Sequence, residues 1–120
     1  MGTRSRLRMV LPAGEARAIY CHWDGYPEHQ MPILTENYNT VEKVRELMEL
    51  GDISYLAPKV KPDEGEEHSF NNPHMDKEGN VDVVVAYHRD RGVPLRNGKN
   101  DGVEEQEFNY LFDGEKWEVE

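Results

Sequence analysis

The chain contains little of what would mark a secreted or membrane protein. It has one cysteine, Cys21, which excludes a disulfide within the chain and is typical of a reducing compartment. It has no long apolar run, and the first thirty residues lack the apolar segment of a secretion signal. Basic residues are also scarce: 14 lysines and arginines stand against 24 acidic residues, which gives a net charge of −10. We therefore expect a cytoplasmic protein.

The sequence also lacks the motifs of the commonest catalytic sites. It has no glycine-rich phosphate loop, no nucleophile elbow and no HExxH pair. His68 and His74 lie six positions apart and His22 and His29 lie seven apart, whereas zinc sites use short spacings of histidine and cysteine. We therefore predict no metal, no cofactor and no catalytic residue.

The charge that is present is divided unevenly along the chain. Residues 1–30 carry four basic and three acidic side chains, whereas residues 31–120 carry ten basic and twenty-one acidic ones. Such an acidic exterior repels nucleic acid and membranes and attracts basic partners. Three early arginines alternate along an expected strand and would line one of its faces: Arg4, Arg6 and Arg8. The row either binds a phosphate or carboxylate, or it is neutralised by nearby acids such as Glu107 or Glu118.

Hydrophobic periodicity predicts one α+β domain over residues 1–120. Alternating residues predict two hairpins with a further strand between them, and an amphipathic stretch predicts one main helix. The expected strands are 3–11, 16–23, 81–89, 108–112 and 116–120, and the expected helix is 40–50, with Asn39 as its cap. The order ββ–α–βββ indicates a single antiparallel sheet with the helix packed on one face.

The remaining segments are less regular. Residues 31–38 could form one or two helical turns. Polar segments rich in proline, glycine and acidic residues predict long exposed loops at 57–80 and 90–106. Residues 81–89 have apolar side chains on both faces, which is typical of a central strand.

The run His22-Trp23-Asp24-Gly25-Tyr26-Pro27-Glu28-His29 concentrates aromatic and titratable side chains at a strand end. It could bind a ligand, or it could be a core tryptophan followed by an Asp-Gly turn and a solvated loop. Alternation of Cys21 and Trp23 assigns both to the core, which argues against a thiol nucleophile. We predict that Trp23 is buried and anchors the sheet, while Tyr26, Glu28 and His29 are exposed.

A second polar run, His88-Arg89-Asp90-Arg91-Gly92, ends the expected strand at 81–89. Arg89 and Arg91 could clamp a phosphate or carboxylate, with His88 as a proton donor. Alternatively, Asp90 and neighbouring acids neutralise the two arginines in an internal ion-pair network.

Several segments together resemble a group of small bacteriophage and prophage proteins without an assigned activity. The segments are Ile19-Tyr20-Cys21-His22-Trp23-Asp24-Gly25-Tyr26-Pro27-Glu28-His29, Gly51-Asp52-Ile53-Ser54, Tyr87-His88-Arg89-Asp90-Arg91-Gly92 and Phe108-Asn109-Tyr110-Leu111-Phe112-Asp113-Gly114. The CHWDGYP run is the specific element. The resemblance implies an accessory protein of a phage or mobile element that acts in the cytoplasm of a bacterial host cell.

Our first functional hypothesis is a non-enzymatic protein that inhibits a host nucleic-acid-handling factor, for example in CRISPR or restriction. The expected partner is a host protein or ribonucleoprotein with a basic groove, and neither free nucleic acid nor a membrane is expected to bind. The expected contact residues are acidic or lie in the aromatic run: Glu42, Glu46, Glu49, Asp63, Glu64, Glu66, Glu67, Glu104, Glu105, Glu107, Tyr26, Glu28 and His29.

The alternative hypothesis is a small-molecule module that sequesters a nucleotide or another phosphorylated signal, with Trp23 or Tyr26 stacking on a base. Its expected ligand-binding residues are Arg4, Arg6, Arg8, His22, His88, Arg89 and Arg91. A third hypothesis is a small hydrolase with His22 or His88 as the general base, although no complete set of nucleophile, base and orienting group is visible.

Overall fold

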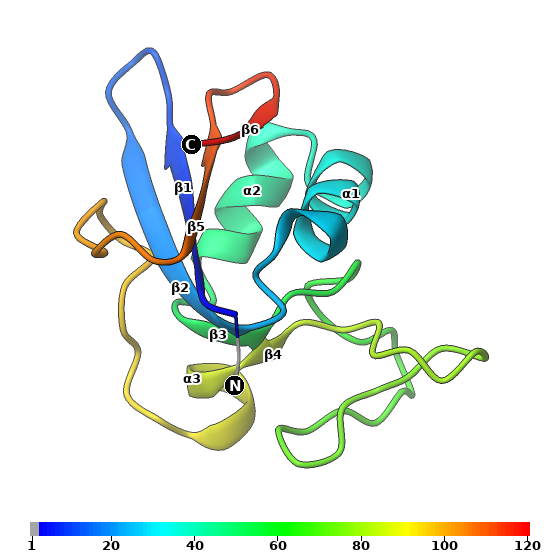
Figure 1. The fold of residues 1–120 in the computed structure, drawn as a ribbon. Coiled ribbons are helices and arrows are strands. Elements are labelled where there is room, and N and C mark those ends of the chain that lie inside the picture. Colours follow the sequence, from blue (N-terminus) through cyan, green and yellow to red (C-terminus); the bar gives the residue numbers. More distant parts are fainter. Residues whose placement is uncertain (1–2) are drawn as a thin grey trace.

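The computed structural model, which describes residues 3–120, is a six-stranded sheet with two helices on one face (Figure 1). The strands are β1 (Ser5–Val10), β2 (Ala16–Trp23), β3 (Ile53–Tyr55), β4 (Val85–Ala86), β5 (Phe108–Phe112) and β6 (Trp117–Val119). The helices are α1 (Pro27–Asn37), α2 (Val41–Met48) and α3 (Tyr87–Arg91). The strand order is β4-β3-β2-β1-β5-β6, and the predicted α+β class is confirmed.

The sheet is mixed, so the prediction of a single antiparallel sheet is wrong. Both predicted hairpins are confirmed, since β1 runs antiparallel to β2 and β5 antiparallel to β6. The pairs β2–β3 and β1–β5, however, are parallel. Parallel neighbours cannot be joined by a tight turn and need a crossover connection. Residues 24–52, which hold α1 and α2, supply one crossover, and residues 92–107 supply the route to β5.

The prediction of one main helix is wrong as well. The expected helix at 40–50 is confirmed as α2, although its cap is Thr40, whose Oγ1 accepts a hydrogen bond from the Lys43 N–H at 3.2 Å. α1 adds eleven residues where one or two turns were expected. It begins with Pro27 in the first turn, where a proline costs no helical hydrogen bond, and it also contains Pro32.

The expected central strand at 81–89 is reduced to β4, a two-residue strand at the edge of the sheet. Its apolar residues are buried, as the pattern indicated, but the chain then turns into α3. The Asp90 Oδ2 accepts the Ala86 N–H at 2.8 Å, which satisfies a free donor at the start of this helix. Gly92 ends the helix with φ of 77°.

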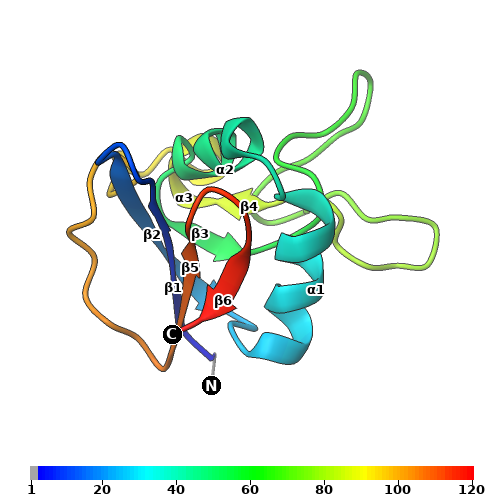
Figure 2. The same ribbon diagram turned by 90° about the horizontal axis from the view of Figure 1, so that it is seen from above.

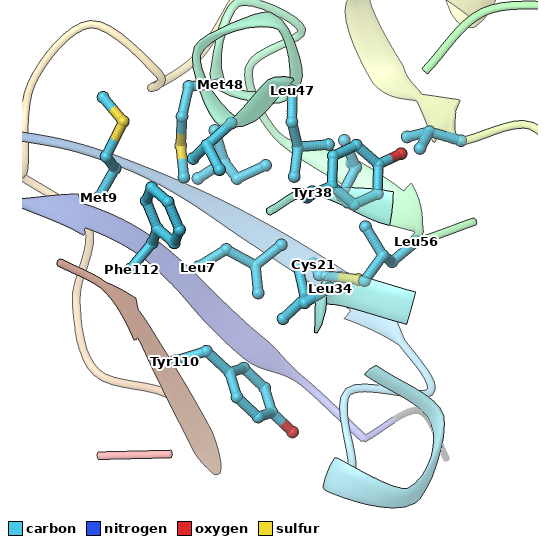
Figure 3. Close-up of a cluster of buried hydrophobic side chains, with 14 of the residues drawn as sticks. Leu7, Met9, Cys21, Leu34, Tyr38, Leu47, Met48, Leu56, Tyr110 and Phe112 are labelled. Atoms are coloured by element: carbon cyan, nitrogen blue, oxygen red, sulfur yellow. The ribbon is translucent and has the colours of Figure 1, made fainter. Parts of the chain in front are cut away.

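The main core lies between the sheet and the helices α1 and α2 (Figure 3). The sheet contributes Leu7, Met9, Tyr110 and Phe112, and the helical layer contributes Leu34, Tyr38, Leu47 and Met48. Trp117 joins this core and donates its Nε1–H to the Tyr38 carbonyl oxygen at 2.8 Å. Within residues 3–120, no helix is both long and apolar enough to cross a membrane.

The turn after β2 depends on a glycine for packing rather than for backbone conformation. Asp24, and not Gly25, has a positive φ, of 51°. A Cβ at Gly25 would lie 2.7 Å from the Ser5 Cβ and 2.8 Å from the Thr3 carbonyl oxygen. The chain can therefore cross this close to β1 only because residue 25 has no side chain.

Residues 92–107, which lead to β5, cross the face of the sheet that α1 and α2 leave uncovered. Residues 98–100 run along the free edge of β2, where the Ala18 N–H donates to the Asn100 carbonyl oxygen at 2.9 Å. Further along, the Val103 carbonyl oxygen accepts a hydrogen bond from the Arg6 Nη1 at 3.0 Å. Figure 2 shows this segment on the side of the sheet away from α1. We call the face that it crosses the open face.

Candidate partner-binding surface

The outer side of α2 presents three carboxylates in a row. Glu42, Glu46 and Glu49 are exposed, because the helix buries Val44, Leu47 and Met48 against the sheet. Within residues 3–120, none of the three glutamates forms an ion pair. We call these three residues the acidic row.

The acidic loop at 63–67 is partly neutralised by its own neighbours. The Lys59 Nζ lies 3.1 Å from the Asp63 Oδ2 and 3.1 Å from the Glu66 Oε1. Asp63 remains exposed, as do Glu64 and Glu67. A shallow groove between this loop and α2 is lined by residues of both, including Lys43, Glu46, Lys59, Lys61 and Asp63. The loop therefore extends the surface of α2, with lysines interspersed.

Three further predicted acidic contacts lie on the opposite side of the molecule. Glu104, Glu105 and Glu107 are exposed on the segment that crosses the open face. α2 covers the other face of the sheet (Figure 2). The sheet separates these three glutamates from the acidic residues of α2 and the 63–67 loop. One partner groove cannot contact both groups at once, so they are two separate candidate surfaces.

The structure overturns the predicted burial of Trp23, which is 44% exposed. Its strand neighbour Cys21 is fully buried under α1, but β2 continues past the helical layer before the chain turns at Asp24. Burial raises the pKa of the Cys21 thiol to about 11, against the opposing effect of a hydrogen bond from Gln30, so this thiol is an inert core group.

The other predictions for this run are mixed. Tyr26 is 37% exposed and Glu28 is exposed, as predicted. His29 is half-buried instead, because its Nε2 lies 3.1 Å from the Leu56 carbonyl oxygen. Tyr55, which was not among the predicted site residues, is a further aromatic side chain at this end of the sheet.

Four aromatic side chains, Trp23, Tyr26, His29 and Tyr55, lie at the ends of β2 and β3 and at the start of α1. The Trp23 ring packs edge-on against the His22 ring, with 4.8 Å between centroids. Trp23 and Tyr55 are register partners in the two parallel strands. The His29 ring lies 4.8 Å from the Tyr55 ring and 6.1 Å from the Tyr26 ring, measured between centroids. We call Trp23, Tyr26, His29 and Tyr55 the aromatic platform. Burial, followed by the charge of the nearby Asp24, raises the pKa of Tyr55.

Two members of the arginine row are neutralised internally. The Arg8 guanidinium lies 2.7 Å from the Asp101 carboxylate and 2.8 Å from that of Glu120, which also lies 3.6 Å from Arg6. The hydrogen bond from Arg8 holds the pKa of Asp101 below its usual range. Arg6 and Arg8 are thus compensated internally, by Asp101 and Glu120 and not by Glu107 or Glu118, the two acids named as examples. Arg4 is exposed.

The arginines of the second polar run are also engaged within the chain. The Arg89 Nε donates to the Asp90 Oδ1 at 2.8 Å, and the same guanidinium donates to the carbonyl oxygens of Val60 and Val84. Arg91 lies over the Phe70 ring, 5.1 Å from its centroid. These contacts favour the internal network over an anion clamp formed by the pair.

Asp90 also binds the loop at 57–80 through a buried histidine. The His68 Nε2 lies 3.2 Å from the Asp90 Oδ2, and its Nδ1 accepts the His74 backbone N–H at 2.9 Å. This pair of bonds assigns a neutral ring with the proton on Nε2. His74 in turn lies 2.6 Å from the Asp82 carboxylate. The loop has no helix or strand, as predicted, but these contacts attach it to the rest of the fold.

The carboxylates of this network predict a loss of stability in acid. Burial alone would raise the pKa of Asp90 and Asp82, but Arg89 and His74 respectively hold these pKa values below the usual range. Such groups stabilise the fold above their unfolded pKa, about 4, and lose that contribution as the pH falls through the folded value. We expect a lower free energy of urea unfolding near pH 3 than near pH 7, and a smaller difference in Asp90→Asn. Equal wild-type values would contradict this expectation.

The open face holds a cavity of about 190 Å³. It is lined by Tyr20, Asp52, Tyr87, His88, Val93, Pro94 and Arg96. The Tyr20 hydroxyl lies 2.7 Å from the His22 Nδ1, and the His88 Nδ1 lies 2.7 Å from the Val93 carbonyl oxygen. An adjoining hollow shares Tyr20, Asp52 and Arg96 with it. Among residues 3–120, no three histidine, cysteine or acidic side chains gather as metal ligands would.

Comparison with protein-family models, curated proteins and solved structures gave no match to this chain. The resemblance to phage and prophage proteins therefore stays a prediction, and the functional argument rests on the surface itself.

Proposed function

We propose that this protein is a non-catalytic inhibitor of a bacterial nucleic-acid-handling factor and that it places the acidic row of α2 in the basic groove of that factor. An anti-CRISPR or anti-restriction protein of a phage or mobile element would act in this way. The observation that carries the proposal is the acidic row itself, in which Glu42, Glu46 and Glu49 are exposed and have no ion-pair partner within residues 3–120.

The spacing of the row suits a groove that normally holds a phosphate backbone. With a rise of about 1.5 Å per residue, the three carboxylates are spread over about 10 Å along the helix axis. Phosphates of one nucleic acid strand recur about every 3.4 Å along its axis, so the row covers about three nucleotides. The net charge of −10 adds long-range attraction toward a basic surface.

A capture experiment tests this proposal. The full chain, immobilised through a tag, is incubated with bacterial lysate treated with nuclease, and the retained proteins are identified by mass spectrometry. We expect a nucleic-acid-binding protein that is retained at low salt and released as the salt concentration rises, because electrostatic association is screened. Retention only of proteins that do not bind nucleic acid, or retention insensitive to salt, would contradict the proposal.

The open-face cavity supports a second candidate function, binding of a small phosphorylated ligand. His88 was expected at such a site, and the cavity adds two tyrosine rings that can stack on a base and Arg96, which has no ion pair within residues 3–120. The Arg6, Arg8, Arg89 and Arg91 side chains, by contrast, have the internal partners described above.

A thermal-shift screen against nucleotides tests the second candidate. A ligand at 100 times its dissociation constant is expected to stabilise the fold by about 2.7 kcal/mol. The shift should disappear in Arg96→Gln and persist in Arg91→Gln, a matched variant outside the cavity. An absence of any shift, or a shift retained by Arg96→Gln, would contradict a nucleotide site at this place.

A further inference from the structure

We propose that the aromatic platform is a docking site for an arginine side chain of the protein partner. This inference rests on the proposed function, since it supplies a contact for the same basic partner. The two proposals concern different residues. The acidic row attracts the partner through its charge over a distance, whereas the aromatic platform would hold one guanidinium group of the partner in direct contact.

The exposure of the platform indicates that it binds something. Trp23 and Tyr26 are 44% and 37% exposed. The Tyr26 ring lies beside that of His29, which in turn contacts Tyr55, and Trp23 is the register partner of Tyr55. Tryptophan and tyrosine are the residues that most often dominate the energy of protein interfaces. Clustered exposed aromatic rings are typical of an interaction surface, whereas single exposed apolar residues need no explanation.

The charges around the rings select a cation. Asp24 and Glu28 lie between members of the platform in the sequence, and neither forms an ion pair within residues 3–120. Asp24 directly follows Trp23, the last residue of β2 and the register partner of Tyr55, so it lies at the same end of the sheet as the platform. Nucleic acid, which could also stack on the rings, would bring phosphates against both carboxylates.

Arginine fits this environment better than lysine. Its planar guanidinium stacks on an aromatic face and presents several N–H donors in one plane, whereas an ammonium group does not stack. A guanidinium over Trp23 or Tyr55 could donate to the Asp24 carboxylate in a charge-assisted pair. The His29 Nε2 is held at the Leu56 carbonyl oxygen, which leaves the Nδ1 of the neutral ring as a further acceptor.

A titration of the full chain with short synthetic peptides tests the inference, with intrinsic tryptophan fluorescence as the readout. Trp23 is exposed and Trp117 is buried, so a ligand at the platform changes the emission of Trp23. We expect a peptide of alternating arginine and glycine to bind at least tenfold more tightly than a peptide with citrulline, the uncharged isostere, in place of arginine. The lysine peptide should bind more weakly than the arginine peptide.

Variants assign the site, with binding of the arginine peptide measured by calorimetry. Trp23→Ala and Asp24→Asn should each weaken it at least tenfold, whereas Met75→Ala, which removes another exposed apolar side chain, should leave it unchanged. Unchanged affinity in Trp23→Ala, equal binding of the citrulline peptide, or tighter binding of single-stranded DNA at this site would overturn the inference. If Trp23→Ala still captures the partner from lysate as the wild type does, the platform fails while the proposed function stands.

Discussion

Replacing Trp117 with alanine is expected to destabilise the fold by about 3–5 kcal/mol, a large share of the stability of a small domain. Trp117 is 4% exposed, its ring lies 5.4 Å from that of Phe112, and its Nε1–H donates to the Tyr38 carbonyl oxygen. Alanine would leave a cavity between β6 and α1 and an unpaired buried carbonyl group. Urea unfolding followed by circular dichroism measures the effect.

Two control variants separate the contribution of the buried ring from that of its hydrogen bond and from the loss of any tryptophan. Trp117→Phe keeps most of the volume and loses the hydrogen bond, so it should cost less than Trp117→Ala. Trp23→Ala removes the other tryptophan from an exposed position and should change the free energy of unfolding by less than 1 kcal/mol or so, as surface substitutions do. A larger loss in Trp23→Ala than in Trp117→Ala would contradict the structure.

The tryptophans also show where prediction from the sequence stops. Trp23 alternates with buried Cys21, and the same alternation assigns a core position to both. Alternation gives the side of the sheet toward which a residue points, but not whether a helix covers that part of the strand. The helix that decides this, α1, was not predicted at its full length, so the end of β2 was assigned to the core.

Elements with strong local signals were predicted correctly. The two hairpins follow from alternating strands around short turns, and α2 follows from its apolar stripe of Val44, Leu47 and Met48. α1 contains Pro27 and Pro32 and has only a weak apolar stripe, and α3 depends on the bond from the Ala86 N–H to the Asp90 carboxylate. The sequence pattern alone therefore predicts neither the full length of α1 nor the presence of α3.

The sequence predicted the exposure of most acidic residues in the candidate surface, but not on which side of the sheet each of them lies. Exposure of the acidic row followed from the helical pattern. That Glu104 and Glu105 lie on the opposite side of the sheet depends on the crossover over the open face, for which the sequence carries no local signal. The partners Asp101 and Glu120 of Arg8 depend on the same crossover and on the parallel pairing of β1 with β5.

Reversing the charges of the acidic row is expected to abolish capture of the partner, with a loss of affinity of at least about 100-fold, equivalent to about 2.7 kcal/mol. The variant Glu42→Lys, Glu46→Lys, Glu49→Lys changes the net charge from −10 to −4, because each substitution adds two positive charges. Its side chains are exposed, so the melting temperature should stay close to that of the wild type.

The matched control is the same reversal on the open face, at Glu104, Glu105 and Glu107. It also gives a net charge of −4, so any effect of total charge is shared by the two variants. We expect the control to retain most of the affinity. Equal losses in the two variants would indicate that total charge, and not the acidic row, attracts the partner.

The most direct measurement of the central claim is a competition between this protein and nucleic acid for the captured partner. A fluorescently labelled oligonucleotide is bound to the purified partner, and its anisotropy is followed as the protein is added. The proposed function predicts that the protein releases the oligonucleotide completely, with an apparent affinity equal to that of direct binding, and that the acidic-row variant does not. A stable ternary complex, with the oligonucleotide still bound at saturating protein, would contradict occupation of the basic groove.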